Sequence, residues 1–253
     1  MLERIFDSLQ LPEKCIRHDK TLFKKLFHDN GELTARDKKL FQEQIDKIVL
    51  HFNLNPSNSN ILAFQNEERR YLELPIISVS LKARKGAARI ADVIQRTLPH
   101  PCLLVLCTED AVILHVAHQR IHGSDTAKIT LEATEQSPWL VEAGLTAHQQ
   151  AFLQALDSRQ FRFTNLYDFY SDLFQRVQAL NAAEISGRFN EGSGHAKQVE
   201  ETASRLNHYR SLQSRVEEHR NALKGEPHFN RKTELKLQIQ QLKAEMATLA
   251  AQL

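Results

Sequence analysis

Cysteine, glycine and proline are all scarce in this chain of 253 residues. The three cysteines, Cys15, Cys102 and Cys107, form an odd set, which argues against a disulfide framework and for a reducing compartment. We therefore expect free thiols and a cytoplasmic protein. The 8 glycines and 7 prolines are too few for the many turns of an all-β barrel. A helix-rich chain with a small sheet is favoured.

Long apolar runs and an excess of one charge are also missing. No run of about eighteen apolar residues occurs, and the opening segment MLERIFDSLQLPEKC lacks the apolar core of a signal peptide. We therefore expect no membrane partner. The 33 basic residues nearly balance the 31 acidic ones, and a net charge of +2 does not select nucleic acid or an anionic membrane. The 42% hydrophobic content is enough for a folded core.

The first part of the chain, residues 1–188, predicts an α+β body that begins with a helical leader over 1–56. Within the leader, the segment 33–54 starts at a near capping box of Thr34 and Asp37. Its apolar residues then recur at helical spacing, which predicts one long helix.

Four short runs rich in β-branched residues follow between 69 and 135. An amphipathic helix separates the first run from the second. Glu109 and Asp110 fill the two-residue gap between the second and third runs, which predicts an antiparallel hairpin. The region predicts a small mixed or antiparallel sheet flanked by helices.

Two helices are expected between 146 and 186. Thr146 with Gln149, and Asn165 with Asp168, have the spacing of helix caps. The second helix and the loop before it are unusually aromatic, which favours packing on the sheet over an exposed stacking surface. These aromatic residues are Phe161, Phe163, Tyr167, Phe169, Tyr170 and Phe174.

A glycine- and serine-rich segment at 189–195 predicts a flexible linker. The remaining residues, 196–253, have apolar side chains that alternate three and four positions apart, the pattern of a coiled-coil seam. Gly225 and Pro227 interrupt the pattern, which predicts a C-terminal antiparallel helical hairpin. We expect this seam to bind a protein partner or a second copy of the chain through Tyr209, Leu212, Val216, Leu223, Leu235, Ile239, Leu242, Met246 and Leu249.

No reactive constellation is evident in the sequence, so no catalytic residues are assigned. Neither form of glycine-rich phosphate loop occurs, and we expect no cofactor. The nearest set of metal ligands is Cys102, Cys107, His115 and His118. Strand residues three or five positions apart point to opposite faces, so we predict no metal site there.

Two alternatives stay open. A divergent metal-dependent nuclease would use Glu73, Asp110 or Asp125, although no strand carries the expected acidic-x-lysine triplet and Asp125 falls in a predicted loop. A DNA-binding adaptor would use the densest basic patch, which runs from the end of a strand into a helix. Its residues are Lys82, Arg84, Lys85, Arg89 and Arg96.

Five collinear segments resemble one known family. They are LPEKCIRHDKTLFKKLF, TARDKKLFQEQIDKIVLHFNLNP, the strand runs from ELPIISVSL to VILHVAHQRI, FTNLYDFYSDLFQRVQALNAAEISGRF, and FNRKTELKLQIQQLK. Together they cover nearly the whole chain and resemble the bacterial family of domain of unknown function 4391. The resemblance implies a setting beside a superfamily-2 helicase and a DNA methyltransferase in restriction-like or phage-defence gene clusters, and it implies no active site.

The leading hypothesis is therefore a non-catalytic accessory or adaptor subunit of a bacterial phage-defence or restriction-modification-like complex. Its expected partners are a helicase, a DNA methyltransferase or both, with DNA contacted indirectly if at all. Self-association through the hairpin is the other expected contact. The absence of a reactive constellation and the coiled-coil seam behind a linker motivate this hypothesis.

Overall fold

The computed structural model describes residues 1–30, 33–122, 125–190 and 196–253. The chain forms two compact units, Met1–Gln178 and Ala179–Leu253, and the division falls inside one helix, α7 (Leu166–Ser186). In the described ranges, none of the helices has the length and apolar character needed to cross a membrane.

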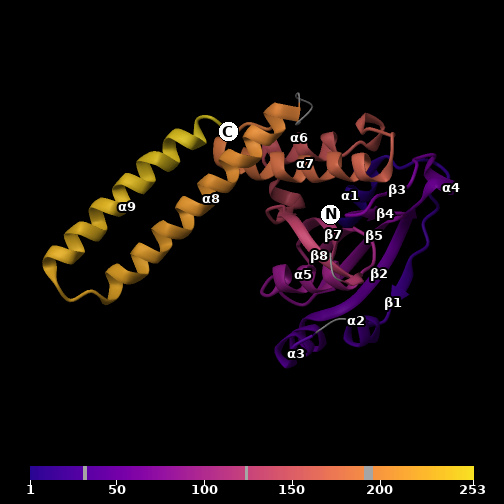
Figure 1. Cartoon of the computed structure of the whole chain (residues 1–253), viewed down its shortest axis with the longest axis horizontal. Coiled ribbons are helices and arrows are strands. Elements are labelled where there is room, and N and C mark those ends of the chain that lie inside the picture. Colours follow the sequence, from indigo (N-terminus) through magenta and orange to yellow (C-terminus); the bar gives the residue numbers. More distant parts are fainter. Residues whose placement is uncertain (31–32, 123–124, 191–195) are drawn as a thin grey trace. The chain divides into compact units, whose positions relative to one another are not determined.

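A seven-stranded sheet forms the centre of the first unit (Figure 1). The strand order is β1-β2-β5-β6-β7-β8, with β9 paired to β7. Strands β5 and β6 are parallel, and every other pairing in this sheet is antiparallel. The strands are β1 (Lys20–Leu22), β2 (Ile45–Leu54), β5 (Leu74–Leu81), β6 (Leu103–Cys107), β7 (Ala111–His122), β8 (Asp125–Gln136) and β9 (Leu140–Val141). The predicted mixed sheet and its β6–β7 hairpin are confirmed.

Helices cover both faces of this sheet (Figure 1). Helix α5 (Ala87–Thr97) connects the parallel strands and shares one core with α2 (Lys24–Asn30) and α3 (Ala35–Gln44). On the other face, the Tyr170 hydroxyl of α7 donates to the carbonyl of Cys102 and accepts from the amide of Ala117. The remaining helical segments are α1 (Leu2–Leu9), α4 (Pro56–Ser59), α6 (Ala147–Ala155) and two short 3₁₀ turns, η1 (Glu142–Gly144) and η2 (Ser158–Gln160).

A small hairpin of β3 (Phe64–Gln65) and β4 (Arg70–Tyr71) stands apart from the main sheet. The aromatic side chains of α7 largely pack inward. Phe169, Tyr170 and Phe174 are buried, and only Phe163 of the aromatic group is among the exposed large apolar residues.

The single helix predicted over 33–54 is wrong, and so is the wholly helical leader over 1–56. Helix α3 ends at Gln44 and β2 begins at Ile45, whose backbone is extended. Two β-bulges in β2 disturb the alternation of buried and exposed residues. Its apolar residues consequently fall at spacings of three and four, which imitate a helical face.

The predicted helix starts are confirmed. Reciprocal capping boxes join Thr34 to Asp37 and Thr146 to Gln149. At the start of α7, the Asp168 amide donates to the Asn165 side chain at 2.9 Å. The α7 helix ends at Gly187, whose φ of 77° lies in the left-handed region that terminates helices. Most of the predicted linker, residues 191–195, lies outside the described residues.

The second unit contains a two-helix hairpin made of α8 (Ala196–Gly225) and α9 (Phe229–Ala250), which run side by side (Figure 1). At 1.5 Å per residue the two helices are roughly 45 and 33 Å long. Leu212, Val216, Ile239 and Leu242 form its buried core. The predicted helical hairpin is confirmed.

Candidate functional site

The carboxylates of the nuclease alternative do not converge. Glu73 directly precedes β5, whereas Asp110 follows the carboxyl end of β6, which is parallel to β5. The two residues therefore lie at opposite ends of the sheet, separated by roughly the 25 Å length of an eight-residue strand. The backbone of Asp125 lies in β8 and not in the predicted loop, and its side chain is outside the described part of the chain.

The cysteine and histidine candidates also face in different directions. His115 is paired with Leu104, which belongs to the core beneath α5, while His118 contacts Tyr170 of α7 on the other face. Burial raises the pKa of the Cys102 thiol and raises that of Cys107 to about 12. Both thiols are protonated at neutral pH and are poor metal ligands.

Most of the basic patch is neutralised by ion pairs. Arg84 binds Asp110 at 2.5 Å, Arg96 binds Asp92 at 2.9 Å, and Lys82 lies 3.8 Å from Asp46. Arg89 also contacts a carboxylate, that of Asp37, at 2.8 Å. Paired cations release fewer counterions when they meet a phosphate backbone. DNA binding through this patch stays a prediction, and its least compensated member in the described chain is Lys85.

An ion pair between Arg89 and Asp37 links α5 to α3. The Nε and a terminal nitrogen of Arg89 donate to the two oxygens of Asp37, each at 2.8 Å. Asp37 is 4% exposed and also accepts a hydrogen bond from the hydroxyl of Thr34, the N-cap residue of α3. Bonds from Arg89 and Thr34 hold the pKa of Asp37 well below its usual range. The pair is therefore ionised and structural.

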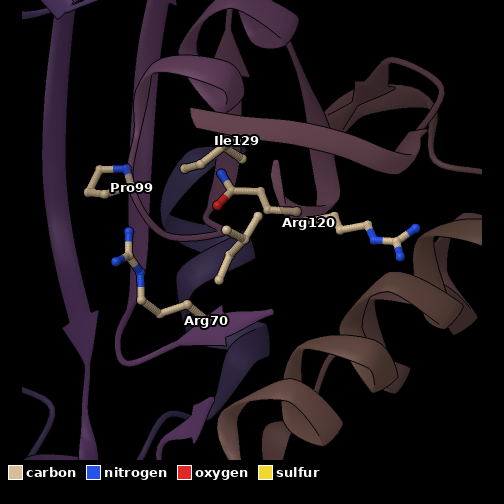
Figure 2. A pocket seen from close by; sticks show the side chains of 6 residues that line it. Arg70, Pro99, Arg120 and Ile129 are labelled. Atoms are coloured by element: carbon tan, nitrogen blue, oxygen red, sulfur yellow. The ribbon is translucent and has the colours of Figure 1, made fainter. Parts of the chain in front are cut away.

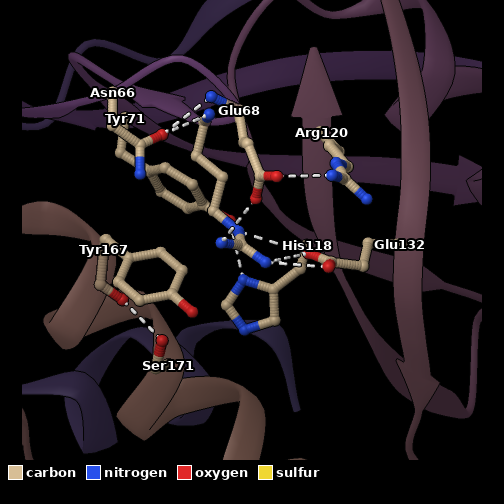
Figure 3. Close-up of polar contacts among 9 residues, drawn as sticks. Asn66, Glu68, Tyr71, His118, Arg120, Glu132, Tyr167 and Ser171 are labelled. Atoms are coloured by element: carbon tan, nitrogen blue, oxygen red, sulfur yellow. Dashed lines mark hydrogen bonds and ion pairs between the residues drawn. The ribbon is translucent and has the colours of Figure 1, made fainter. Parts of the chain in front are cut away.

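A largely aromatic cluster surrounds His118 between the β3–β4 hairpin and α7 (Figure 3). The Tyr71 hydroxyl lies 2.7 Å from His118 Nδ1, and the Tyr167 ring packs 5.1 Å from Tyr71 and 5.5 Å from His118 between ring centres. Arg69 lies over Tyr167 and binds both carboxylate oxygens of Glu132. The cluster thus has an ion pair at its edge.

Within this cluster, His118 and Tyr71 are both uncharged at neutral pH. Burial lowers the pKa of His118 to about 4 and raises the pKa of Tyr71 above its ordinary value. The bond between the neutral His118 and the neutral Tyr71 joins the β3–β4 hairpin to β7, and the Phe64 ring of β3 stacks on Tyr167 of α7. We assign this cluster a structural role.

A shallow hollow lies beside β7 (Figure 2). Its lining residues are Arg70, Pro99, Gln119, Arg120, Ile121 and Ile129. The Arg120 guanidinium points away from the hollow and binds Glu68, while the Gln119 amide donates to two backbone carbonyls. The hollow has room for about one water molecule, far less than a pocket for an organic ligand.

A third polar array lies on the α7 side of the sheet, where β2 meets β5. Asp19 Oδ1 lies 2.5 Å from His51 Nδ1, and His51 Nε2 lies 2.8 Å from Ser78 Oγ. His51 and Ser78 are 5% and 3% exposed. The Arg17 guanidinium, followed by His51, holds the pKa of Asp19 below its ordinary value, so this carboxylate is ionised. The connectivity is that of an acid–base–nucleophile triad.

The hairpin residues predicted to bind a partner mostly face one another. Leu212, Val216, Ile239 and Leu242 form the core, and Leu223, Met246 and Leu249 pack against it. Leu235 is also buried, and Tyr209 is half-buried. The seam therefore builds the hairpin, and the exposed large apolar side chains of these helices lie instead on the outer face of α9. There Phe229 is 80% and Leu237 is 55% exposed.

A model of the family described as Domain of unknown function (DUF4391) matches residues 9–246. The chain belongs to this family. No curated protein and no solved structure matches the chain significantly. The matched DUF4391 range includes Asp19, His51 and Ser78, all of α8 and most of α9.

Sequence reasoning missed two features of this DUF4391 chain. Asp19, His51 and Ser78 come from three separate segments and form no motif. The pairing of β2 with β5 brings His51 to Ser78, and the pairing of β1 with β2 brings Asp19, which directly precedes β1, to His51. Phe229 directly follows the turn and lies outside the seam, so the seam pattern does not predict it. An apolar side chain next to a turn, off the predicted core, is the signal that was available.

Proposed function

We propose that the chain is an accessory subunit of a bacterial phage-defence or restriction-modification-like complex. In this proposal the C-terminal hairpin binds the helicase or the DNA methyltransferase. Its outer surface, defined here as Phe229, Lys236, Leu237 and Lys243 of α9, forms the contact. The body keeps its own fold.

The observation that carries the proposal is the exposure of Phe229 and Leu237 on a helix whose core side is already satisfied. An isolated exposed apolar residue is ordinary, but Phe229 and Leu237 are the exposed large apolar residues among the described residues of the second unit, and both lie on α9. Burying such side chains in a partner contributes about 2 kcal/mol each.

Two lysines beside the exposed apolar residues of α9 favour a partner surface that carries carboxylates. Phe229, Lys236 and Lys243 are spaced seven residues apart, so they lie along one flank of α9, next to Leu237. In the described part of the chain, no ion pair is found for Lys236 or Lys243. An apolar groove bordered by carboxylates is the complementary surface.

Replacing both Phe229 and Leu237 with serine should weaken partner binding at least tenfold without changing the unfolding temperature. Both side chains are exposed, so the hairpin core is untouched, while the complex loses its apolar contact. Co-elution with the purified partner on size exclusion measures binding, and circular dichroism measures unfolding. Gln213→Ser, an exposed change on the other helix, α8, is the matched control. Equal co-elution of the double variant and the control would locate the partner surface elsewhere.

A further inference from the structure

The Asp19–His51–Ser78 array is built with unusual backbone geometry. In the pairing of β2 with β5, Leu50 lies opposite Ile77 and Phe52 lies opposite Ile76, which leaves His51 as the extra residue of a β-bulge. Bulges redirect side chains and are common beside active sites. The backbone carbonyl of His51 accepts a hydrogen bond from the His18 amide at 2.8 Å.

Asp19 also has a rare backbone conformation. Its φ of 50° lies in the left-handed region, which residues other than glycine adopt at a cost. Asp19 is held there by Arg17, whose Nε donates to the same carboxylate oxygen that binds His51. A bulge and a strained residue thus converge to place one carboxylate on Nδ1 and one hydroxyl on Nε2 of a single imidazole.

This connectivity suits proton transfer. With the Nδ1 proton held by Asp19, Nε2 of neutral His51 is the acceptor for the Ser78 hydroxyl. After taking that proton, the imidazolium donates to both neighbours, and the Asp19 carboxylate stabilises its charge. We propose that Ser78 is a nucleophile that accepts an acyl group from small carboxylic esters. His51 is its general base, and Asp19 positions His51.

The proposed reaction needs only these three residues, the ester and water. Ser78 Oγ forms a bond to the acyl carbon and its proton passes to His51 Nε2. The ester C–O bond then breaks, and the alcohol leaves with that proton. A water molecule next attacks the acyl group on Ser78, His51 accepts the water's proton, and the serine oxygen recovers it as the acid leaves. An ester suits this site better than an amide because alkoxide is the better leaving group.

Helix α1 covers the array. The Phe6 ring packs 4.6 Å from the His51 ring and 5.4 Å from Phe52, and the Arg17 guanidinium lies 5.2 Å from the Phe6 ring. The same Arg17 binds Glu3, and the Met1 ammonium binds Glu142 at 2.7 Å. Ser78 is buried, so in this proposal substrate reaches it when α1 moves away from His51, and removing the Phe6 ring should make the site more reactive.

A fluorophosphonate probe tests the proposal on the full chain. The Ser78 oxygen would displace fluoride from phosphorus, and His51 would take the proton. We expect intact-mass spectrometry to show one adduct and peptide mapping to place it on Ser78. Labelling should fall about a hundredfold in His51→Gln, the usual contribution of a general base. Phe6→Ala should accelerate it about tenfold or more.

Ser80→Ala is the matched control, since Ser80 lies two residues along β5 and on the same face of the sheet. This variant should be labelled at the wild-type rate, whereas Ser78→Ala should not be labelled. If Ser78→Ala fails to fold, two results still test the proposal: the position of the adduct on the wild-type chain, and the labelling rate of His51→Gln. No adduct on the wild type or on Phe6→Ala, an adduct on Ser80, or a rate unaffected by His51→Gln would each overturn the proposal. Hairpin binding does not enter this experiment, so its result is independent of the proposed accessory role.

Discussion

Leu242→Asp is expected to unfold the C-terminal hairpin while the body stays folded. Leu242 is buried in the small core that it shares with Leu212, Val216 and Ile239. The variant loses the transfer energy of a leucine and buries a carboxylate without a partner, which together cost about 4 kcal/mol or more. A two-helix core has few other contacts to offset this loss, and partner binding should disappear with the fold of the hairpin.

Hydrogen exchange followed by mass spectrometry measures this effect region by region. Peptides from 200–253 should exchange rapidly in Leu242→Asp, while peptides from the sheet keep their wild-type protection. Gln240→Asp introduces the same charge two residues away at an exposed position and should change neither region. Loss of protection in the sheet as well would show that the two units unfold together.

Acidification is expected to destabilise the body steeply between pH 6.5 and pH 4. Burial lowers the pKa values of His115 and His118 to about 4. In the unfolded chain both histidines take up protons near pH 6.5. The unfolded state therefore binds more protons than the folded state across this window, so stability falls as the pH falls, by about 3 kcal/mol for each histidine. Below pH 4 this contribution levels off.

His115→Leu isolates one of the two contributions. Among the described side chains, none bonds to Nδ1 of His115, so leucine should be tolerated at pH 7. Urea unfolding at several pH values should show a profile flatter by about 3 kcal/mol between pH 6.5 and pH 4. Ile113→Leu, on the same strand and face, should shift the profile without changing its slope. An unchanged slope in His115→Leu would mean that His115 is not the group that titrates.

Local signals predicted much of this fold because each depends on a few neighbouring residues. The Thr34–Asp37 and Thr146–Gln149 caps, the β6–β7 hairpin and the turn at Gly225 are all read from short windows. Strand β2 was mistaken for a helix because its bulges are created by pairing with β5, a distant segment. Local spacing cannot report such a partner.

The sites depend on that same long-range information. Asp19, His51 and Ser78 meet only because β1, β2 and β5 are neighbours in the sheet. The basic patch looked available in the sequence because its carboxylate partners, such as Asp37 for Arg89, lie far away in the chain. The hairpin seam was predictable from the spacing of its apolar residues. That these residues face one another follows from the packing of α8 against α9, which the spacing alone does not specify.

Capture of partners from the native host tests the central claim most directly. Tagged full-length chain and a truncation after Gly187, which retains all of α7, would be compared by mass spectrometry of the co-purified proteins. The proposal predicts that the full chain recovers a helicase or a DNA methyltransferase, and that the truncation folds but recovers neither. Recovery of the same enzyme by the truncation would contradict it and place the contact on the body.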